Sequence, residues 1–392
     1  MKLKTYFRLL AQDRLHGGLW NWMLNPCLAG ASFFYRIGMY FHKGWYEKGF
    51  GKRRKFQIPV VSVGNITWGG TGKTPLVEHL GHFFIEQKKT PLILGRGYGN
   101  DENKELVEKI PSALFGFGPD RFTEGQKVLK ENPAHVIILD DGFQHWALER
   151  NLDLITVSAI NPFGNGHLIP RGILREPIQS LKRASIVLLT DVNLVPRKDV
   201  DELKEKIRVV APHIAFMEAH HEPLFFYRPQ TKERVSLNRM TGARVTCFSG
   251  IGTPRSFQML INLLGLRTIR TFEFCDHHEY ADAELLEIKS MKESSGSEEV
   301  ITTEKDFFRC SKSIAQIVRP LVLKVRLCIS SGEDILHERL RKLVGIEPEI
   351  KPFVTQPVLQ NSQKEIAESV ASPSLVDDLD DSGEVDSPEG NG

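Results

Sequence analysis

The most restrictive feature of the sequence is an apolar run that leads directly into a glycine-rich turn and then into a helix-compatible segment. The run covers residues 58–63, the turn reads GNITWGGTGKT over residues 64–74, and Pro75 stands near the first helical position, where proline is tolerated. Glycines let backbone N–H groups converge on phosphate oxygens, and a helix N-terminus adds a favourable dipole. This order of elements predicts a phosphate-binding loop.

Two side chains at the end of the turn have specific roles in such a loop. Lys73 is expected to reach the β- and γ-phosphates of a nucleoside triphosphate, and Thr74 to ligate Mg2+. The standard spacing has its first glycine where this sequence has Thr67, so we expect the later glycines to supply the flexibility. The predicted nucleotide-binding residues of the loop are Thr67, Gly69, Gly70, Thr71, Gly72, Lys73 and Thr74.

Short apolar runs alternate with helical patterns along the following sequence. The predicted strands are 58–63, 91–94, 135–139, 152–157 and 186–189, and the helical segments between them include 75–87 and 122–130. This alternation predicts an α/β fold: a P-loop NTPase-like parallel sheet with helices on both faces. A smaller C-terminal α/β domain follows, with expected strands at 244–248 and 300–303 and a helix after Pro254.

The predicted organisation has four parts. Residues 1–55 form an N-terminal membrane-interfacial segment, 56–191 the P-loop core, 192–354 a second α/β domain that closes the nucleotide cleft, and 355–392 an acidic tail. The tail is rich in Ser, Asp and Glu and poor in apolar residues, which predicts disorder.

Charge is distributed unevenly over the 392 residues. The net charge is +2, but residues 361–392 carry nine acidic residues and the single Lys364, which leaves 50 basic and 40 acidic residues in 1–360. Such a body suits phosphates, an anionic membrane surface or nucleic acid, and charge does not choose among them. The five cysteines form no CxxC pair, which argues against a disulfide framework and a cysteine zinc site.

The N-terminal segment has an uncharged, aromatic stretch between basic flanks. Residues 18–35 read GLWNWMLNPCLAGASFFY, and Lys and Arg residues stand on both sides. The stretch is marginal for a spanning helix, which needs about 20 apolar residues. We expect helical structure that lies in the headgroup region of an anionic membrane. A helix packed on the body and a true span are the alternatives, and no cleavable signal peptide is evident.

A second polar cluster follows the predicted strand 135–139. Asp140 and Asp141 stand at its carboxyl end, the edge where ligands of open α/β sheets bind, and paired acids there can hold Mg2+. Capping of the next turn is the alternative for Asp140. Gln144 and His145 come next, and we expect His145 to contact a phosphate or a sugar unless it is a structural histidine.

These segments, taken together, resemble one family, the tetraacyldisaccharide 4'-kinases. The matching motifs are VSVGNITWGGTGKTP (61–75), GRGYG (95–99), ILDDGFQH (138–145), GNGHLIPRGILREP (164–177), SGIGTP (249–254), DHHEY (276–280) and TEKD (303–306). They cover about residues 55–310 in family order, and the family tends to carry Ser or Thr at the position of Thr67. The resemblance implies transfer of the γ-phosphate of ATP, with Mg2+, to the 4'-hydroxyl of a tetraacylated glucosamine disaccharide 1-phosphate in lipid A biosynthesis.

The resemblance also implies a base that takes the proton of the sugar hydroxyl. Family members use an Asp of a Gly-Asp-Glu element with a histidine of the DHH element. The nearest match here is Asn100-Asp101-Glu102, so Asp101 is the predicted base, its alternative being an exposed turn aspartate. Of the adjacent His277 and His278 we favour His278 as its partner, and Lys73 completes the predicted catalytic set.

The remaining predicted site residues are charged. Arg96, Arg121, Arg171 and Arg175 are expected to bind substrate phosphates together with Gln144 and His145, because guanidinium groups match phosphate geometry; surface ion pairs are the alternative. Glu176 is expected to extend the magnesium contacts of Thr74, Asp140 and Asp141. Glu304, Lys305 and Asp306 are expected to line the nucleotide cleft, unless they cap the next helix.

The resemblance implies a peripheral protein on the cytoplasmic face of a membrane, with a lipid-linked disaccharide as substrate, no nucleic-acid partner and no obligate protein partner. A P-loop GTPase switch or metallocentre chaperone is the rival from another class. It would need an Asn-Lys-x-Asp element, whereas residues 303–306 read TEKD, and an Asp-x-x-Gly element, which Asp140-Asp141-Gly142 does not match. A non-catalytic membrane-binding relative is a third reading, which the intact Lys73 and Thr74 oppose.

Overall fold

The computed structural model describes residues 19–97 and 100–346, and side chains from 24–97 and 103–346. The predicted tail 355–392 lies outside these ranges. The described strands are β1 (Val60–Gly64), β2 (Pro91–Gly95), β3 (Leu114–Phe117), β4 (Val136–Asp140), β5 (Leu152–Ser158), β6 (Ile186–Thr190), β7 (Ala215–Tyr227), β8 (Arg234–Val235), β9 (Arg244–Ser249), β10 (Arg267–Glu273), β11 (Glu299–Thr303) and β12 (Leu321–Ser331).

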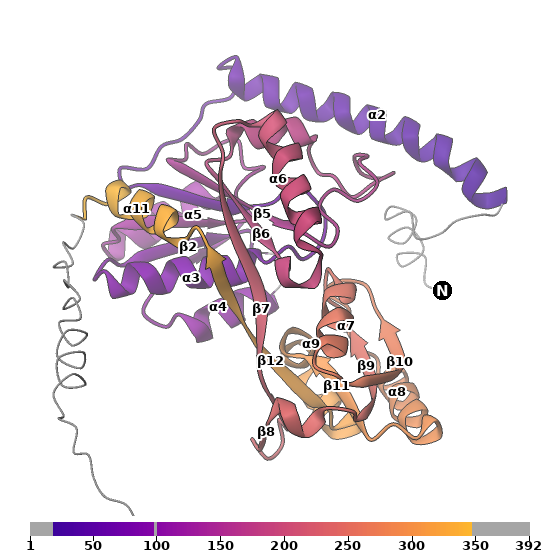
Figure 1. Ribbon diagram of the computed structural model, residues 1–392. Helices are drawn as coiled ribbons and strands as arrows, with labels where there is room; N and C mark the ends of the chain where they lie inside the picture. Colours follow the sequence, from indigo (N-terminus) through magenta and orange to yellow (C-terminus); the bar gives the residue numbers. More distant parts are fainter. Residues whose placement is uncertain (1–18, 98–99, 347–392) are drawn as a thin grey trace, which may run out of the picture. The chain divides into compact units, whose positions relative to one another are not determined.

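Helices connect and cover these strands (Figure 1). The described α-helices are α2 (Leu19–Glu47), α3 (Lys73–Glu86), α4 (Asn100–Lys109), α5 (Arg121–Glu131), α6 (Arg197–Val210), α7 (Pro254–Leu263), α8 (Asp282–Ser295), α9 (Glu304–Arg309), α10 (Ser311–Ser313) and α11 (Glu333–Leu343). Three 3-10 helices, η1 (Ile178–Arg183), η2 (Val192–Leu194) and η3 (Leu237–Met240), and the π-helix η4 (Ile314–Val318) complete the described elements.

The strands form one mostly parallel sheet in the order β10-β9-β11-β12-β7-β6-β5-β1-β4-β2-β3, with β8 paired to β7. Every strand that the sequence predicted is present within one or two residues of its expected bounds, so the α/β prediction is confirmed. Parallel order follows from the helical crossovers, because a helix returns the chain to the same edge of the sheet. The sheet places the carboxyl ends of β1, β4, β5 and β6 side by side.

Helices cover both faces of the sheet, as strand β4 demonstrates. Its side chains alternate between faces, so Val136 and Ile138 pack in the apolar cluster that contains residues of α3, while Ile137 and Leu139 pack in another cluster with residues of α5. All four are fully buried. A strand buried on both faces reads as a continuous apolar run, which is why the sequence predicted it.

The long strands β7 and β12 join the two ends of the sheet. They pair antiparallel from Val322 opposite Tyr227 to Ser331 opposite Glu218, whereas the other pairs of the main sheet order are parallel. Figure 1 shows them side by side between β6 and β11. Strands on both sides of residue 191 therefore share one sheet, and the boundary predicted at 191/192 does not separate two sheets.

Helix α2 is one continuous helix through Pro26 and presents an aromatic face to solvent. Phe33, Phe34, Tyr40, Phe41 and Trp45 are each more than half exposed, with Phe41 at 76%. Their spacing repeats at helical period and places them on one side of the helix. No helix among the described residues is long and apolar enough to cross a bilayer.

The last described helix, α11, is held against the sheet by apolar burial. Leu336 and Leu340 are fully buried in the same cluster as Leu80 and Phe84 of α3. The C-terminal end of the described chain is thereby packed beside the helix that follows the phosphate-binding loop.

We predict that Leu336→Ala lowers the free energy of unfolding by about 2–5 kcal/mol, because it leaves a cavity in a closed core. The matched control is Leu263→Ala, since Leu263 is 63% exposed at the end of α7. Urea unfolding followed by circular dichroism checks both. Equal midpoints for the two variants would contradict the packing described for α11.

Candidate active site

The glycine-rich turn carries the main chain from β1 into α3. Helix α3 begins at Lys73, two residues before Pro75, and Gly72 caps it in the left-handed region at φ 87°. A Cβ atom on Gly72 would stand 3.0 Å from Thr190 Cγ2, in a backbone conformation that side chains disfavour. Glycine is therefore required where the loop passes the end of β6.

Side chains beneath the loop fix its shape. The Asn65 amide donates to Thr71 Oγ1 at 2.9 Å, and the hydroxyls of Thr71 and Thr156 share a hydrogen bond of 2.7 Å. Thr190 donates to the Thr71 carbonyl at 3.2 Å. Thr67 is buried and bridges to the backbone of Leu174, so it shapes the loop from behind.

Asp140 and Asp141 lie at the end of β4, facing the loop. Arg175 Nη1 donates to both carboxylate oxygens of Asp141 at 2.9 Å, and Lys73 Nζ lies 3.6 Å from one of them. Burial opposes ionisation of Asp141, but Lys73 and Arg175 outweigh it and lower its pKa to about 2. Asp141 is therefore a carboxylate at neutral pH, as a magnesium ligand must be.

A cleft of about 1020 Å³ opens over these residues. Of the predicted site residues it is lined by Gly69, Gly70, Thr71, Gly72, Lys73, Thr74, Arg96, Asp140, Asp141, Arg175, His277, Glu304 and Lys305. The donor set fits a nucleoside triphosphate with Mg2+, because backbone N–H groups, an ammonium and a hydroxyl meet two carboxylates at one sheet edge.

The other predicted residues do not line this cleft. Glu176 is 2% exposed and accepts from Arg183 at 2.8 and 3.0 Å and from Gln144 at 3.1 Å. Gln144 also donates to the Asn65 carbonyl at 2.9 Å. Glu176, expected to extend the magnesium site, and Gln144, expected to contact substrate, thus bond protein groups behind the phosphate-binding loop.

Two arginines and a histidine that were expected to contact substrate also lie outside the lining of this cleft. Arg121 is 4% exposed and donates to the Asp140 carbonyl at 2.8 Å, which positions the end of β4. Arg171 is half-buried, and its carbonyl accepts from Asn165. Burial, with Arg121 and other arginines nearby, lowers the pKa of His145 to about 4, so this side chain is neutral at pH 7.

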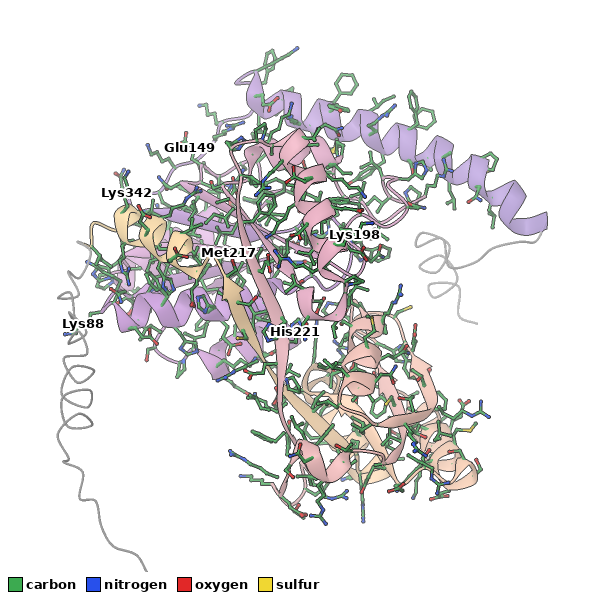
Figure 2. All side chains as sticks on the ribbon, in the orientation of Figure 1. Lys88, Glu149, Lys198, Met217, His221 and Lys342 are labelled. Atoms are coloured by element: carbon green, nitrogen blue, oxygen red, sulfur yellow. The ribbon has the colours of Figure 1, made fainter. Side chains whose placement is uncertain are left out.

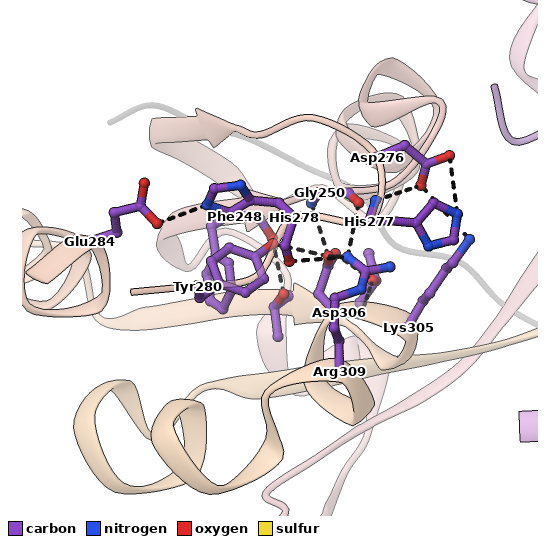
Figure 3. Close-up of polar contacts among 12 residues, drawn as sticks. Phe248, Gly250, Asp276, His277, His278, Tyr280, Glu284, Lys305, Asp306 and Arg309 are labelled. Atoms are coloured by element: carbon purple, nitrogen blue, oxygen red, sulfur yellow. Dashed lines mark hydrogen bonds and ion pairs between the residues drawn. The ribbon is translucent and has the colours of Figure 1, made fainter. Parts of the chain in front are cut away.

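The DHH segment separates its two histidines (Figure 3). His278 turns away from the cleft, and its Nε2 lies 2.7 Å from Glu284 Oε2. His277 has φ 57° and lines the cleft, with Nε2 3.9 Å from Asp276 Oδ2. The sequence favoured His278, whereas His277 is the histidine of this pair that lines the cleft.

The segment that follows β11 has two residues in the cleft and one buried residue behind it. Glu304 and Lys305 line the cleft, and Lys305 Nζ lies 3.8 Å from Asp276 Oδ1. Asp306 is fully buried, and it accepts from the Thr303 hydroxyl at 2.7 Å and from the Gly250 amide at 2.9 Å (Figure 3). Thr303 caps α9, since its hydroxyl accepts from the Asp306 amide at 3.2 Å, and the Asp306 carboxylate ties this cap to the 249–254 loop.

Sequence reasoning missed a carboxylate–histidine pair in the cleft. Asp191 follows β6 in the left-handed region at φ 60°, is 3% exposed, and its Oδ1 lies 3.0 Å from His221 Nδ1 on β7. Ser158 donates to its other oxygen at 2.8 Å. Figure 2 labels His221 on its strand. The rule that selected Asp140 also selects Asp191, since both follow predicted parallel strands.

The 249–254 loop contacts the phosphate-binding loop backbone to backbone. A Cβ atom on Gly252 would stand 1.8 Å from the Gly70 nitrogen and 2.6 Å from Gly70 Cα. Thr253 Oγ1 donates to the Gly70 carbonyl at 3.2 Å. Asp101, the predicted base, is the second residue of α4, two residues before the cleft residue Asn103, but its side chain lies outside the described residues.

Known proteins resemble this chain over most of its length. The family model for tetraacyldisaccharide-1-P 4'-kinase matches residues 24–116 and 101–345. A probable mitochondrial tetraacyldisaccharide 4'-kinase of Arabidopsis thaliana is 31% identical over 386 residues, covering 88% of this chain and 98% of that protein. The tetraacyldisaccharide 4'-kinase of Elusimicrobium minutum is 32% identical over 338 residues, covering 78% and 88%.

One solved structure has the same fold. The "apo" form of LpxK from Aquifex aeolicus in complex with ATP aligns with TM-score 0.59 and 23% sequence identity, covering 82% of this chain and 99% of that one.

We predict that Gly252→Ala weakens nucleotide binding, because its Cβ meets backbone atoms of Gly70 that cannot move without deforming the loop. Gly44→Ala is the matched control, since a Cβ there meets nothing within 4 Å. Titration with a fluorescent ATP analogue in the presence of Mg2+ measures both affinities. Equal affinities would show that the two loops do not need this close approach.

Proposed function

The chain belongs to the tetraacyldisaccharide 4'-kinase family, and from this premise we propose that it transfers the γ-phosphate of ATP to the 4'-hydroxyl of a tetraacylated glucosamine disaccharide 1-phosphate. One observation carries the proposal. Lys73 and Thr74 line the same cleft as Asp140 and Asp141, and His277 lines it too. Family membership disfavours the GTPase alternative.

The phosphate-binding loop would hold the nucleotide. Its N–H groups and the N-terminus of α3 face the phosphates, and Lys73 leaves its ion pair with Asp141 to contact the β- and γ-phosphates. Bound Mg2+ would neutralise phosphate charge, with Thr74, Asp140 and Asp141 as its protein-side ligands. Release of Lys73 leaves Arg175 as the cation that holds Asp141 in place.

Proton removal from the sugar hydroxyl requires a group on the acceptor side of the cleft. We assign it to Asp101 with His277 as its partner, because Asp101 stands in the first turn of α4, two residues before the cleft residue Asn103, and His277 lines the cleft. Asp276 lies within 3.9 Å of the His277 ring and within 3.8 Å of Lys305. These neighbours orient the imidazole toward the cleft.

Arg96 and Arg175 remain the proposed contacts to anionic groups, since both line the cleft. Arg96 is exposed and available to a sugar phosphate, while Arg175 already holds Asp141. A guanidinium next to transferring phosphate also stabilises charge that develops there.

Helix α2 is the proposed membrane contact, and ATP would come from the cytoplasmic side. Its exposed aromatic face suits the headgroup region, where rings gain apolar burial and basic residues meet anionic lipid. Its other side is fixed to the body: the Tyr35 hydroxyl donates to the Arg175 carbonyl at 2.9 Å, and the Ser32 hydroxyl donates to the Leu168 carbonyl at 2.8 Å. The exposed Phe34, a proposed lipid contact, therefore stands next to Tyr35, whose side chain bonds the Arg175 main chain.

The proposed activity is tested by incubating the full chain with Mg-ATP and tetraacyldisaccharide 1-phosphate and measuring the bisphosphorylated product. Product is expected, and Lys73→Ala should lower kcat roughly 100- to 1000-fold because a preorganised cation is lost at the phosphates. Absence of product from wild-type protein that still binds ATP would refute the acceptor assignment.

His277→Gln should lower kcat by at least roughly 100-fold, the usual contribution of a positioned acid or base, with little change in ATP affinity. His278→Gln is the matched control, because this neighbour bonds Glu284 outside the cleft. Turnover of both variants is measured in the same assay. If the two variants lose activity equally, the histidine assignment is wrong.

A further inference from the structure

We propose that His79, Glu333 and His337 form a binding site for a divalent transition metal of the zinc class, separate from the magnesium site of the nucleotide. The imidazole Nε2 atoms and a carboxylate oxygen of these residues all lie within 4.8 Å of one another. His79 Nε2 is 3.4 Å and His337 Nε2 is 3.9 Å from Glu333 Oε1.

Two helices that are far apart in the sequence bring these ligands together. His79 lies on α3, and Glu333 and His337 lie four residues apart on α11, so they share one face of that helix. The buried Leu336 and Leu340 pack α11 into the core cluster of α3. Apolar packing therefore fixes the positions of the three donors without help from a metal.

The two ring nitrogens both lie near Glu333 Oε1, at 3.4 and 3.9 Å, without a hydrogen bond to it. Within the described part of the chain, neither His79 Nε2 nor His337 Nε2 has a hydrogen-bond partner, although both atoms are shielded from solvent. Buried ring nitrogens of native proteins are usually satisfied, so two together indicate a missing ligand. The rings are stacked, with centroids 5.8 Å apart, and Phe83 stacks on His337 at 4.5 Å.

The chemistry of the donors selects the class of metal. Zinc takes imidazole and carboxylate ligands at about 2.0–2.1 Å in a tetrahedral arrangement, which puts neighbouring donor atoms roughly 3.4 Å apart. The His79 contact already has this spacing, and the His337 contact is half an ångström wider. Mg2+ prefers oxygen ligands, so this site and the Asp140–Asp141 site bind different ions.

A metal here would link α11 to the helix that carries the phosphate-binding residues. His79 lies six residues after Lys73 and also lines the nucleotide cleft. Three protein ligands leave one tetrahedral position open, and a water molecule from the cleft can fill it. Metal binding would then stabilise the C-terminal helix in its place against α3.

The experiment uses the full chain, freed of metal with a chelator, and titrates it with Co2+ while visible absorption is recorded. We expect one Co2+ per chain with a tetrahedral spectrum, displacement by Zn2+, and a higher melting temperature of the metal-loaded protein. His337→Ala, His79→Ala and the equal-sized Glu333→Gln should each weaken binding by at least roughly tenfold to a hundredfold.

His82→Ala is the matched control, because His82 is an exposed histidine on the same helix and outside the cluster. It should bind Co2+ as the wild type does. The metal-free melting temperature of each variant separates loss of metal ligation from loss of folding. If a histidine variant is unstable without metal, the Co2+ affinity of Glu333→Gln tests the proposal in its place. Absence of binding, binding unchanged in Glu333→Gln and His337→Ala, or intense thiolate bands from cysteine ligation would overturn the proposal.

Discussion

The carboxylate of Asp141 is the point on which the arrangement of the site depends. It joins the end of β4 to Lys73 at the start of α3 and to Arg175 in the loop after β5. Backbone pairing also brings these segments close, since β1 pairs with β4 and the Arg175 amide donates to the Ile66 carbonyl at 2.7 Å. Removing one partner of this half-buried set leaves a charge without its compensating group. Arg121 adds to this frame from below, where it donates to the Asp140 carbonyl. The catalytic edge is thus held by charge, while the sheet behind it is held by apolar burial.

The sequence predicted the site residues that stand directly after a strand of the parallel sheet, because the order of the chain fixes their place at one edge. The loop before Lys73 and the acids after strand 135–139 were predictable because each follows a fully apolar strand and must emerge at the same edge. Asp191 obeys the same rule and was overlooked, since it stands outside any matched motif. β7 could not be foreseen, because its segment contains two histidines and Pro223 and pairs with a strand about a hundred residues later.

The direction in which a side chain of a motif points could not be predicted from the sequence. His277 and His278 are chemically identical and adjacent, and only the positive φ of His277 decides which ring faces the cleft. Glu176 and Gln144 lie inside family motifs, yet tertiary contacts with Arg183 and the Asn65 carbonyl turn them beneath the loop. A motif identifies residues that a site needs, but it does not separate those that contact ligand from those that support the contact.

The pairing of strands β7 and β12 has a consequence for the cleft. They form a two-stranded ribbon whose register shifts between Lys324 and Val325, opposite Pro223, so the ribbon has an irregular point along its length. Leu323 to Leu327 also line the cleft. The strand that joins the C-terminal strands to the rest of the sheet is therefore also a wall of the cleft, so a substitution in β12 reaches sheet pairing and ligand contact at once.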